Sequence, residues 1–404
     1  MLKNVLTIGM MMFIAVGTMA QTVEKNDSVK NAKKTKEYQF TDVKLLKTTP
    51  VKNQSSSGTC WSFAGTAFLE SELLRQGKPE VDLSEMFIVR HAYIEKAEKY
   101  VRMHGTINFG GGGSTLDVLD IIKKYGIVPE EAYKGLNYGL DIHRHGELDA
   151  VLEAYVKAVI TNKNRKLTPS WKEGYIAILD AYLGKEPETF TYQGKEYTPK
   201  TFFDSLGLNL DDYVSITSFT HHPFDQPFAV EVPDNWAWGL SYNVPLEDFS
   251  RIMKNSIDKG YTIFWASDVS ERGFLYNKGY AIVPDDKVKD MSDSEKARWT
   301  KLSEEEKQKE SKEKSKKEKL ITQEVRQEAF DNYETTDDHG MQIVGTAVDQ
   351  NGNKYYKVKN SWGTDNEYDG YFYASEPFVL YKTISYVVNK NAIPKDIQKR
   401  LNLK

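Results

Sequence analysis

Residues Gln54 to Phe63 read QSSSGTCWSF and contain Cys60, the only cysteine of the 404-residue chain. Three serines and a glycine precede this cysteine, and from Cys60 to Arg75 apolar residues recur at helical spacing. The sequence therefore predicts that a loop turns into a helix at Cys60. The unpaired N–H groups and the partial positive charge of a helix N-terminus favour the thiolate, which is the nucleophilic form of cysteine.

Two further polar residues flank a predicted β-hairpin far along the chain. Residues 341–349 and 354–359 alternate like strands, and the Asn-Gly dipeptide between them is a strong turn signal. His339 stands just before the first strand and Asn360 just after the second, so both fall toward the open end of the hairpin. Because a cysteine nucleophile needs a base and a group that orients this base, the two residues are candidates for these roles.

Other groups would complete this candidate site. The side-chain amide of Gln54 and the backbone N–H of Cys60 would face the oxyanion that forms on an attacked carbonyl. Trp362 would shield the contact between histidine and asparagine from water. We interpret Asp337 and Asp338, just before the histidine, as capping or solvent-facing groups.

The composition limits the classes of protein. Lysine and arginine number 54 against 58 aspartates and glutamates, a formal net charge of −4 that gives no general attraction to nucleic acid. Aromatic residues make up 12%, too many for a disordered chain, and the single cysteine excludes disulfides within the chain and multi-cysteine zinc sites. Adjacent side chains of an extended segment point to opposite sides, so we expect His221 and His222 not to share a metal ion. We expect no metal site and no cofactor.

The N-terminus is typical of an exported protein. Lys3 is the only charge before an apolar run at residues 5–16, which is too short to span a bilayer, and Ala20 is a small residue at the expected cleavage position. We expect residues 1–20 to be a signal peptide, residues 21–40 a flexible lead-in, and the mature protein to be periplasmic or secreted without a membrane anchor. A buried N-terminal helix is the alternative.

The rest of the chain reads as an α+β protein with two unlike halves. We place a helical half that carries the nucleophile at residues 41–135, a mainly helical insertion at 136–240, and a β-rich half that carries the histidine and asparagine at 241–404. A charged insertion lies at about 286–325. Its dense run of mixed charges, 287–319, has glutamates that cancel the lysines, so we expect no nucleic-acid partner.

Three separated motifs together resemble the papain family of cysteine peptidases. They are the segment 54–63, the pair His339-Gly340, and the KNSWG motif of residues 359–363. The resemblance implies a papain-like two-domain fold with the site in the cleft between the halves. By their positions in these motifs, the resemblance assigns catalytic roles to Cys60, His339, Asn360 and Gln54, with Trp61 and Trp362 as supporting residues.

Two departures from the simplest members are informative. Ser57 stands where many members have a cysteine, in keeping with the lack of a disulfide. His339 lies 339 − 60 = 279 residues after Cys60, whereas the simplest members have roughly 130–150. More than a hundred residues are therefore inserted between nucleophile and base.

Such an insertion resembles the bleomycin hydrolase (aminopeptidase C) branch of the family, as do shorter matches such as Gly112-Gly113 before a helix. The resemblance places these glycines in the cleft, where a backbone without Cβ can pair with the substrate main chain; a flexible turn is the alternative. The branch also commonly assembles into hexamers. From this resemblance alone we expect a homo-oligomer, and we expect peptides as the partners of the site.

The resemblance implies an aminopeptidase, because in this branch a C-terminal arm enters the cleft and its carboxylate binds the free amine of the substrate. Here Lys404 stands ten residues past Pro394, and ten extended residues span at most about 35 Å. We expect such an arm to be too short, so an endopeptidase stays open unless a loop of the insertion replaces it. A papain-like binding or scaffolding protein without catalysis is the alternative of another class.

Overall fold

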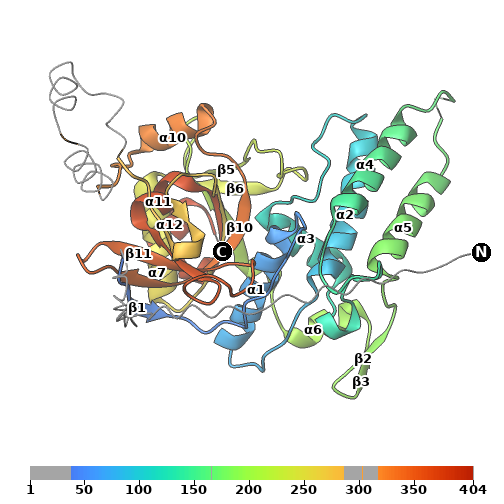
Figure 1. Cartoon of the computed structure of the whole chain (residues 1–404), viewed down its shortest axis with the longest axis horizontal. Helices are drawn as coiled ribbons and strands as arrows, with labels where there is room; N and C mark the ends of the chain where they lie inside the picture. Colours follow the sequence, from blue (N-terminus) through green and yellow to red (C-terminus); the bar gives the residue numbers. More distant parts are fainter. Residues whose placement is uncertain (1–37, 165, 286–302, 304–316, 404) are drawn as a thin grey trace, which may run out of the picture. The chain divides into compact units, whose positions relative to one another are not determined.

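The helix predicted to begin at the cysteine occupies the centre of the protein. In the computed structural model, α1 (Cys60–Arg75) lies between the helices of the N-terminal half and the main sheet (Figure 1). Its residues 61–73 are buried, since it packs against α2 and α3 on one side and against β10 and β7 on the other. Burial on both sides explains why its polar residues are enclosed as well, and the predicted bounds are confirmed.

The structure describes residues 38–164, 166–285, 303 and 317–403. The predicted signal peptide, most of the lead-in and most of the charged run 287–319 lie outside these residues. Within them, no helix is both long and apolar enough to cross a membrane.

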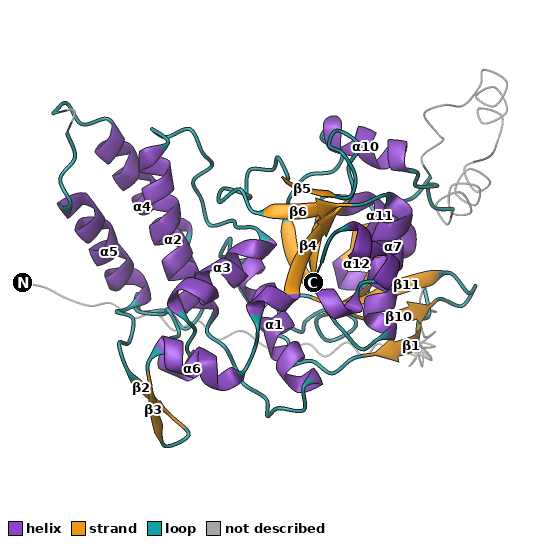
Figure 2. Ribbon diagram, turned by 180° about the vertical axis from the view of Figure 1, so that it is seen from behind, coloured by secondary structure: helices purple, strands orange, loops and turns teal. Residues whose placement is uncertain are grey.

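The helical half surrounds the other face of α1. Figure 2 shows α2, α4 and α5 side by side, with α3 next to α1. Ser84 caps α2 by accepting from Phe87 N, and a capping box of Ser114 and Asp117 begins α3. The helices of this half are α2 (Glu85–Arg102), α3 (Thr115–Tyr125), α4 (Gly146–Ile160), α5 (Ser170–Leu183) and α6 (Pro199–Leu206), with the short turns η1 (Glu130–Ala132) and η2 (Leu210–Asp212).

An 11-stranded sheet forms the other half, in the order β5-β6-β4-β13-β7-β10-β11-β12-β9-β8 with β1 beside β10. A separate hairpin of β2 and β3 lies in the helical half. The strands are β1 (Thr41–Leu45), β2 (Phe190–Tyr192), β3 (Lys195–Tyr197), β4 (Tyr213–Thr217), β5 (Gln226–Ala229), β6 (Leu240–Asn243), β7 (Ile263–Ser267), β8 (Phe274–Leu275), β9 (Tyr280–Ala281), β10 (His339–Val348), β11 (Lys354–Lys359), β12 (Tyr371–Ser375) and β13 (Thr383–Asn389).

Short helices cover the sheet on the side away from α1. Their apolar side chains join the sheet in one buried cluster that includes Phe249, Phe378 and Ile397. These helices are α7 (Leu246–Asp258), α10 (Gln323–Asp331), α11 (Glu376–Lys382) and α12 (Lys395–Arg400), together with η3 (Tyr276–Lys278) and η4 (Lys390–Ala392).

The predicted hairpin is present as β10 and β11. The Asp349 carboxylate accepts hydrogen bonds from the backbone N–H groups of Asn351 and Asn353, and Gly352 between them has a φ of +83°. Gln342 pairs with Lys359 at the far end. This register, which the sequence left open, places the histidine and the asparagine at the same end of the hairpin.

The inserted segment 136–240 contains the expected helices α4 to α6, and it also adds strands to the main sheet. β4 pairs with β13, and β6 pairs with both β4 and β5. The loop between β5 and β6, residues 230–239, leaves the sheet and returns to it. We call this segment the β5–β6 loop, and it forms one wall of the pocket described next.

Candidate active site

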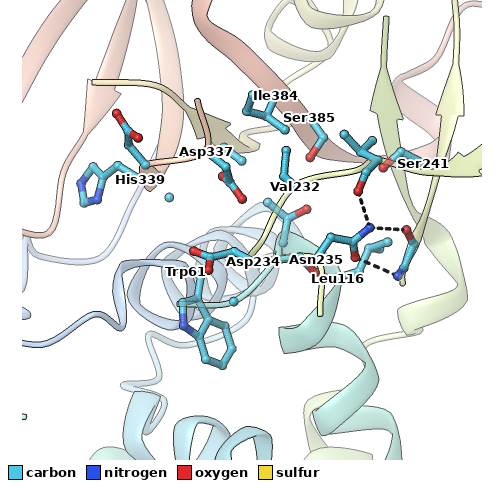
Figure 3. Close-up of a pocket in the computed structure, with 18 of the residues that line it drawn as sticks. Trp61, Leu116, Val232, Asp234, Asn235, Ser241, Asp337, His339, Ile384 and Ser385 are labelled. Atoms are coloured by element: carbon cyan, nitrogen blue, oxygen red, sulfur yellow. Dashed lines mark hydrogen bonds between the residues drawn. The ribbon is translucent and has the colours of Figure 1, made fainter. Parts of the chain in front are cut away.

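One pocket has both Cys60 and His339 on its walls. It lies where the N-terminus of α1, the start of β10, the segment before α3 and the β5–β6 loop meet (Figure 3). Residues from both halves of the chain therefore converge here, as the papain resemblance implies.

A glycine brings the two halves into contact at the nucleophile. The backbone N–H of Gly340 donates to Cys60 Sγ at 3.4 Å. A Cβ at Gly340 would lie 3.0 Å from the Cα of Trp61, closer than side chains normally pack. The absence of a side chain at this position of β10 lets the strand that carries the histidine approach the first turn of α1.

The base is held by the predicted asparagine. His339 Nε2 and Asn360 Oδ1 lie 2.7 Å apart, and both residues are buried. The ring of Trp362 lies with its centroid 4.6 Å from that of the imidazole and covers it. With Nε2 engaged, Nδ1 is the ring nitrogen available for the reaction. The structure thus brings together Cys60, His339, Asn360 and Trp362 as expected, although their catalytic roles remain a proposal.

Burial favours neutral forms of both reacting groups. It raises the pKa of the Cys60 thiol to about 12; the Gly340 N–H opposes this shift, and the carboxylates of Asp337 and Asp234 add to it. Burial lowers the pKa of His339 to about 4, and the hydrogen bond that Nε2 donates to Asn360 Oδ1 opposes this shift. The sequence predicted a thiolate at Cys60, whereas here desolvation of the thiol outweighs the effect of the helix N-terminus.

Gln54 is close to the site but does not line the pocket. Its Nε2 donates to Ser57 O at 2.8 Å, and its Oε1 accepts from Ser361 Oγ at 2.7 Å. The neighbouring Ser361 N donates to Asn360 Oδ1. The amide is therefore fixed next to the residue that orients the base, and one of its two hydrogens is left over.

The two glycines predicted to contact substrate have different positions. Gly113 lines the pocket, and a Cβ there would lie 2.8 Å from the indole of Trp61. Gly112 does not line the pocket, because the carboxylate of Asp234 covers it: a Cβ would lie 2.1 Å from Asp234 Oδ2. Trp61 Nε1 donates to Gly111 O at 2.9 Å and holds this segment against α1.

The sequence interpretation missed the acidic character of the pocket. Asp338 behaves as expected, since it is exposed and accepts from Val269 N, Ser270 N and the Thr336 hydroxyl. Asp337 is different: it lines the pocket, and burial together with neighbouring carboxylates raises its pKa to about 8. The position of Asp337 two residues before His339 is the one feature of the sequence that could have indicated a pocket residue here.

The histidine pair also differs from the expectation. Nε2 of His221 and Nε2 of His222 lie 3.0 and 2.8 Å from the two carboxylate oxygens of Glu231, so the adjacent rings do not point apart. These three residues form the one group in the described chain with the spacing of metal ligands. Their mutual hydrogen bonds account for the arrangement, and Glu231 is largely exposed.

The described C-terminal residues lie away from the pocket. α12 packs against α7, where Arg251 binds Asp396 and Arg400 binds Asp248. Ile397 is fully buried in the cluster beneath the sheet. Among residues up to 403, none after Ser385 lines the pocket.

Comparison with known proteins agrees with this fold. The model of the peptidase C1-like family matches residues 88–404, which include His339 and Asn360 and begin after Cys60. Aminopeptidase C of Lactococcus lactis subsp. lactis is 24% identical over 400 residues, covering 86% of this chain and 82% of the relative. Cysteine proteinase 1, mitochondrial, of Saccharomyces cerevisiae is 23% identical over 405 residues, covering 89% and 78%. The crystal structure of PepW from Lactobacillus rhamnosis matches with a TM-score of 0.67 at 22% identity, covering 90% of this chain and 84% of that one, so the two share a fold.

Proposed function

The chain belongs to the peptidase C1-like family, and from this premise we propose that it is a cysteine aminopeptidase acting through Cys60 and His339. The observation that carries the proposal is the pocket lined both by the thiol at the start of α1 and by the imidazole that Asn360 holds. The similarity to proteins named aminopeptidase C supports the exopeptidase assignment.

The reaction begins with proton transfer within the neutral pair. As Sγ attacks the carbonyl carbon of the peptide bond, its proton passes to Nδ1 of His339, so charge forms only with substrate in place. The N–H of Cys60, at a helix N-terminus without a helical acceptor, donates to the oxyanion together with the free amide hydrogen of Gln54.

Collapse of this intermediate breaks the C–N bond. The imidazolium gives its proton to the leaving amine, and the acyl group stays on sulfur as a thioester. His339 then takes a proton from water, the hydroxide adds to the thioester carbonyl, and the sulfur leaves and is reprotonated. Asn360 keeps the imidazole in the plane that both steps need, because its Oδ1 stays on Nε2 throughout.

An endopeptidase is the second candidate. It is favoured by one observation: the described C-terminal residues pack on α7 and do not enter the pocket, so they do not close the cleft. Comparing hydrolysis of a free and an N-acetylated form of one fluorogenic peptide distinguishes the two, because only an endopeptidase cleaves both well.

The first test of the proposed chemistry is covalent labelling. We expect a peptidyl epoxide to modify Cys60 at neutral pH and to abolish hydrolysis of aminoacyl coumarin amides, with Cys60→Ser as the unlabelled control. A folded protein that neither reacts with the epoxide nor hydrolyses any peptide amide would instead be a binding protein of the same fold.

Two further parts of the proposal rest on sequence alone. We propose export because of residues 1–20. Amino-terminal sequencing of the protein recovered from the producing cell tests it, with a mature start at Gln21 expected. A homo-oligomer is proposed from the family resemblance, and light scattering of the purified protein tests it.

A further inference from the structure

Beyond the reacting atoms, the pocket is lined by carboxylates. Asp234 of the β5–β6 loop and Asp337 and Asp338 just before β10 all line it. Asp338 is exposed and holds the backbone N–H groups of Val269 and Ser270. Asp234 and Asp337 are the less exposed pair, and Figure 3 shows both in the same part of the pocket.

Asp337 has no compensating partner. Within the described chain its carboxylate accepts no hydrogen bond and pairs with no cation, and the charges that act on it are Asp234, Asp338 and Asp117. Burying a carboxylate without a partner costs free energy and is found where the charge has a use. Its ionised form would be stabilised by a cation that enters the pocket.

Asp234 is held in place by the loop that carries it. The neighbouring Asn235 donates to Val230 O and Gly239 O and accepts from Gly239 N, which fixes the loop from within. Asn108 donates to Asp234 Oδ1 at 3.1 Å. The carboxylate therefore has a defined position against the glycine segment, as expected of a group that recognises part of a substrate.

Contacts with α2 anchor the same loop to the helical half. Lys96 Nζ lies 5.5 Å from the ring centroid of Trp236, and Lys99 Nζ lies 3.5 Å from that of Trp238. Lys96 is buried and its charge acts on Asp234, but its ammonium already donates to the carbonyls of residues 110 and 112. The nearby lysine is thus used to hold the glycine segment.

The two carboxylates are close to the nucleophile as well. Both Asp337 and Asp234 act on the thiol of Cys60 and raise its pKa. Because Cys60, Asp234 and Asp337 line one pocket, a peptide whose scissile carbonyl lies at Cys60 has neighbouring atoms within reach of the acidic wall, and we assign this wall to the atoms that precede the carbonyl. The β5–β6 loop stands over Gly112, where a longer peptide would continue along the cleft.

We propose that Asp234 and Asp337 bind the α-ammonium group of the substrate and thereby restrict cleavage to bonds near a free amino terminus. This inference rests on the proposed peptidase function and assigns its selectivity to named residues. An ammonium has three N–H donors and no acceptor, which suits two carboxylates from different segments. An acetylated terminus brings a neutral amide carbonyl toward the same oxygens, where it is repelled.

The test compares leucyl and N-acetyl-leucyl coumarin amides as substrates, since the same pocket has an apolar wall with Leu116, Val232 and Ile384. The full-length protein and its variants Asp234→Asn and Asp337→Asn are assayed for kcat/KM on both compounds. Asp204→Asn, an exposed carboxylate on α6, is the control for the loss of one negative charge.

We expect each pocket variant to lose about 10- to 100-fold in kcat/KM on the free-amine substrate, mainly through KM, and to keep or gain activity on the acetylated one. Asp204→Asn should match the parent on both. Pocket variants that keep the parent's ratio between the two substrates would overturn the inference while leaving the peptidase proposal intact. A parent protein inactive on both compounds and on longer peptides would overturn the proposed function itself.

If either Asp234→Asn or Asp337→Asn fails to fold, the other variant still tests the inference. Either the removal of one residue or the removal of a dipeptide from a free terminus supports the inference, because both require recognition of the ammonium. Equal cleavage of free and acetylated longer peptides by the parent contradicts it.

Discussion

The two ends of the pocket are built on opposite principles. At the reaction end, His339 and the nearby Asn360 and Gln54, which lie behind the pocket wall, are buried, and each has a hydrogen-bond partner from a neighbouring segment. At the acidic end, Asp337 faces other carboxylates and has no partner within the described chain. Catalysis needs groups in fixed orientation, and recognition of a charged ligand needs a charge that the protein has left uncompensated.

Among the variants that distinguish the reaction end from the acidic end, removal of the Cys60 thiol should have the largest effect on activity. Cys60→Ala should lower kcat/KM by roughly 10⁵- to 10⁶-fold on free and acetylated substrates alike, since the nucleophile serves both. The far-ultraviolet circular dichroism should not change, because the replaced group is small. Retention of hydrolysis in this variant would place the chemistry elsewhere.

A smaller loss is expected from the residue that orients the base. Asn360→Ala removes the hydrogen bond to His339 Nε2, worth about 1–3 kcal/mol when buried, or roughly 5- to 150-fold in kcat. KM should change little, and the preference for the free amine should stay as in the parent. A change in that preference would show that the two ends are not independent.

The pH dependence should differ between the ends. His339 loses its role as base when protonated, so turnover of the acetylated substrate should fall only as the pH approaches about 4. Asp337, which faces Asp234, Asp338 and Asp117, has a pKa of about 8. Its charge, and with it the preference for the free amine, should therefore decline as the pH falls below 8.

Above about pH 8 the α-amino group of the substrate loses its positive charge, because its pKa is about 7.7–8.0. The ratio of kcat/KM between free and acetylated substrate should accordingly peak near neutral to slightly alkaline pH. Measuring the ratio from pH 5 to 9 checks this, and a constant ratio across the range would contradict a role for Asp337.

The smallest expected effect concerns stability. The folded-state pKa of Asp337 is raised, so between about 4 and 8 the folded protein binds more protons than the unfolded chain, and this group lowers stability as pH rises. Because Asp337 is partly exposed and solvent screens its charge, we expect Asp337→Asn to stabilise the protein by about 1–2 kcal/mol at pH 8, well below what the full pKa shift implies, and by less at pH 5 in urea unfolding. Asp338→Ala, which removes the acceptor of the Val269 and Ser270 N–H groups, should instead destabilise it.

The reaction end could be predicted because its residues lie in short contiguous motifs. The helix from Cys60 and the hairpin closed by an Asn-Gly turn follow from local patterns, and the fold follows once the papain resemblance is seen. The resting protonation state could not be predicted, because desolvation depends on how closely Gly340 approaches α1.

The acidic end could not be predicted from local patterns, since its position depends on distant contacts. Asp234 reaches the pocket on a loop whose Trp236 and Trp238 contact lysines of α2, far away in the sequence. Asp337 and Asp338 look alike as a dipeptide, yet Asp337 is partly buried, whereas Asp338 is exposed and binds backbone N–H groups.

The segment that carries Asp234 connects two antiparallel neighbours, β5 and β6, and is therefore a hairpin loop. Such connections accept insertions and deletions more readily than the strands that they join. The length of this loop would set how many substrate residues fit in the cleft before the scissile bond. A shorter loop leaves room for more residues, and a longer loop leaves room for fewer. Divergence or engineering could in this way reset how much of a peptide is removed in each cycle while the sulfur and its imidazole stay as they are.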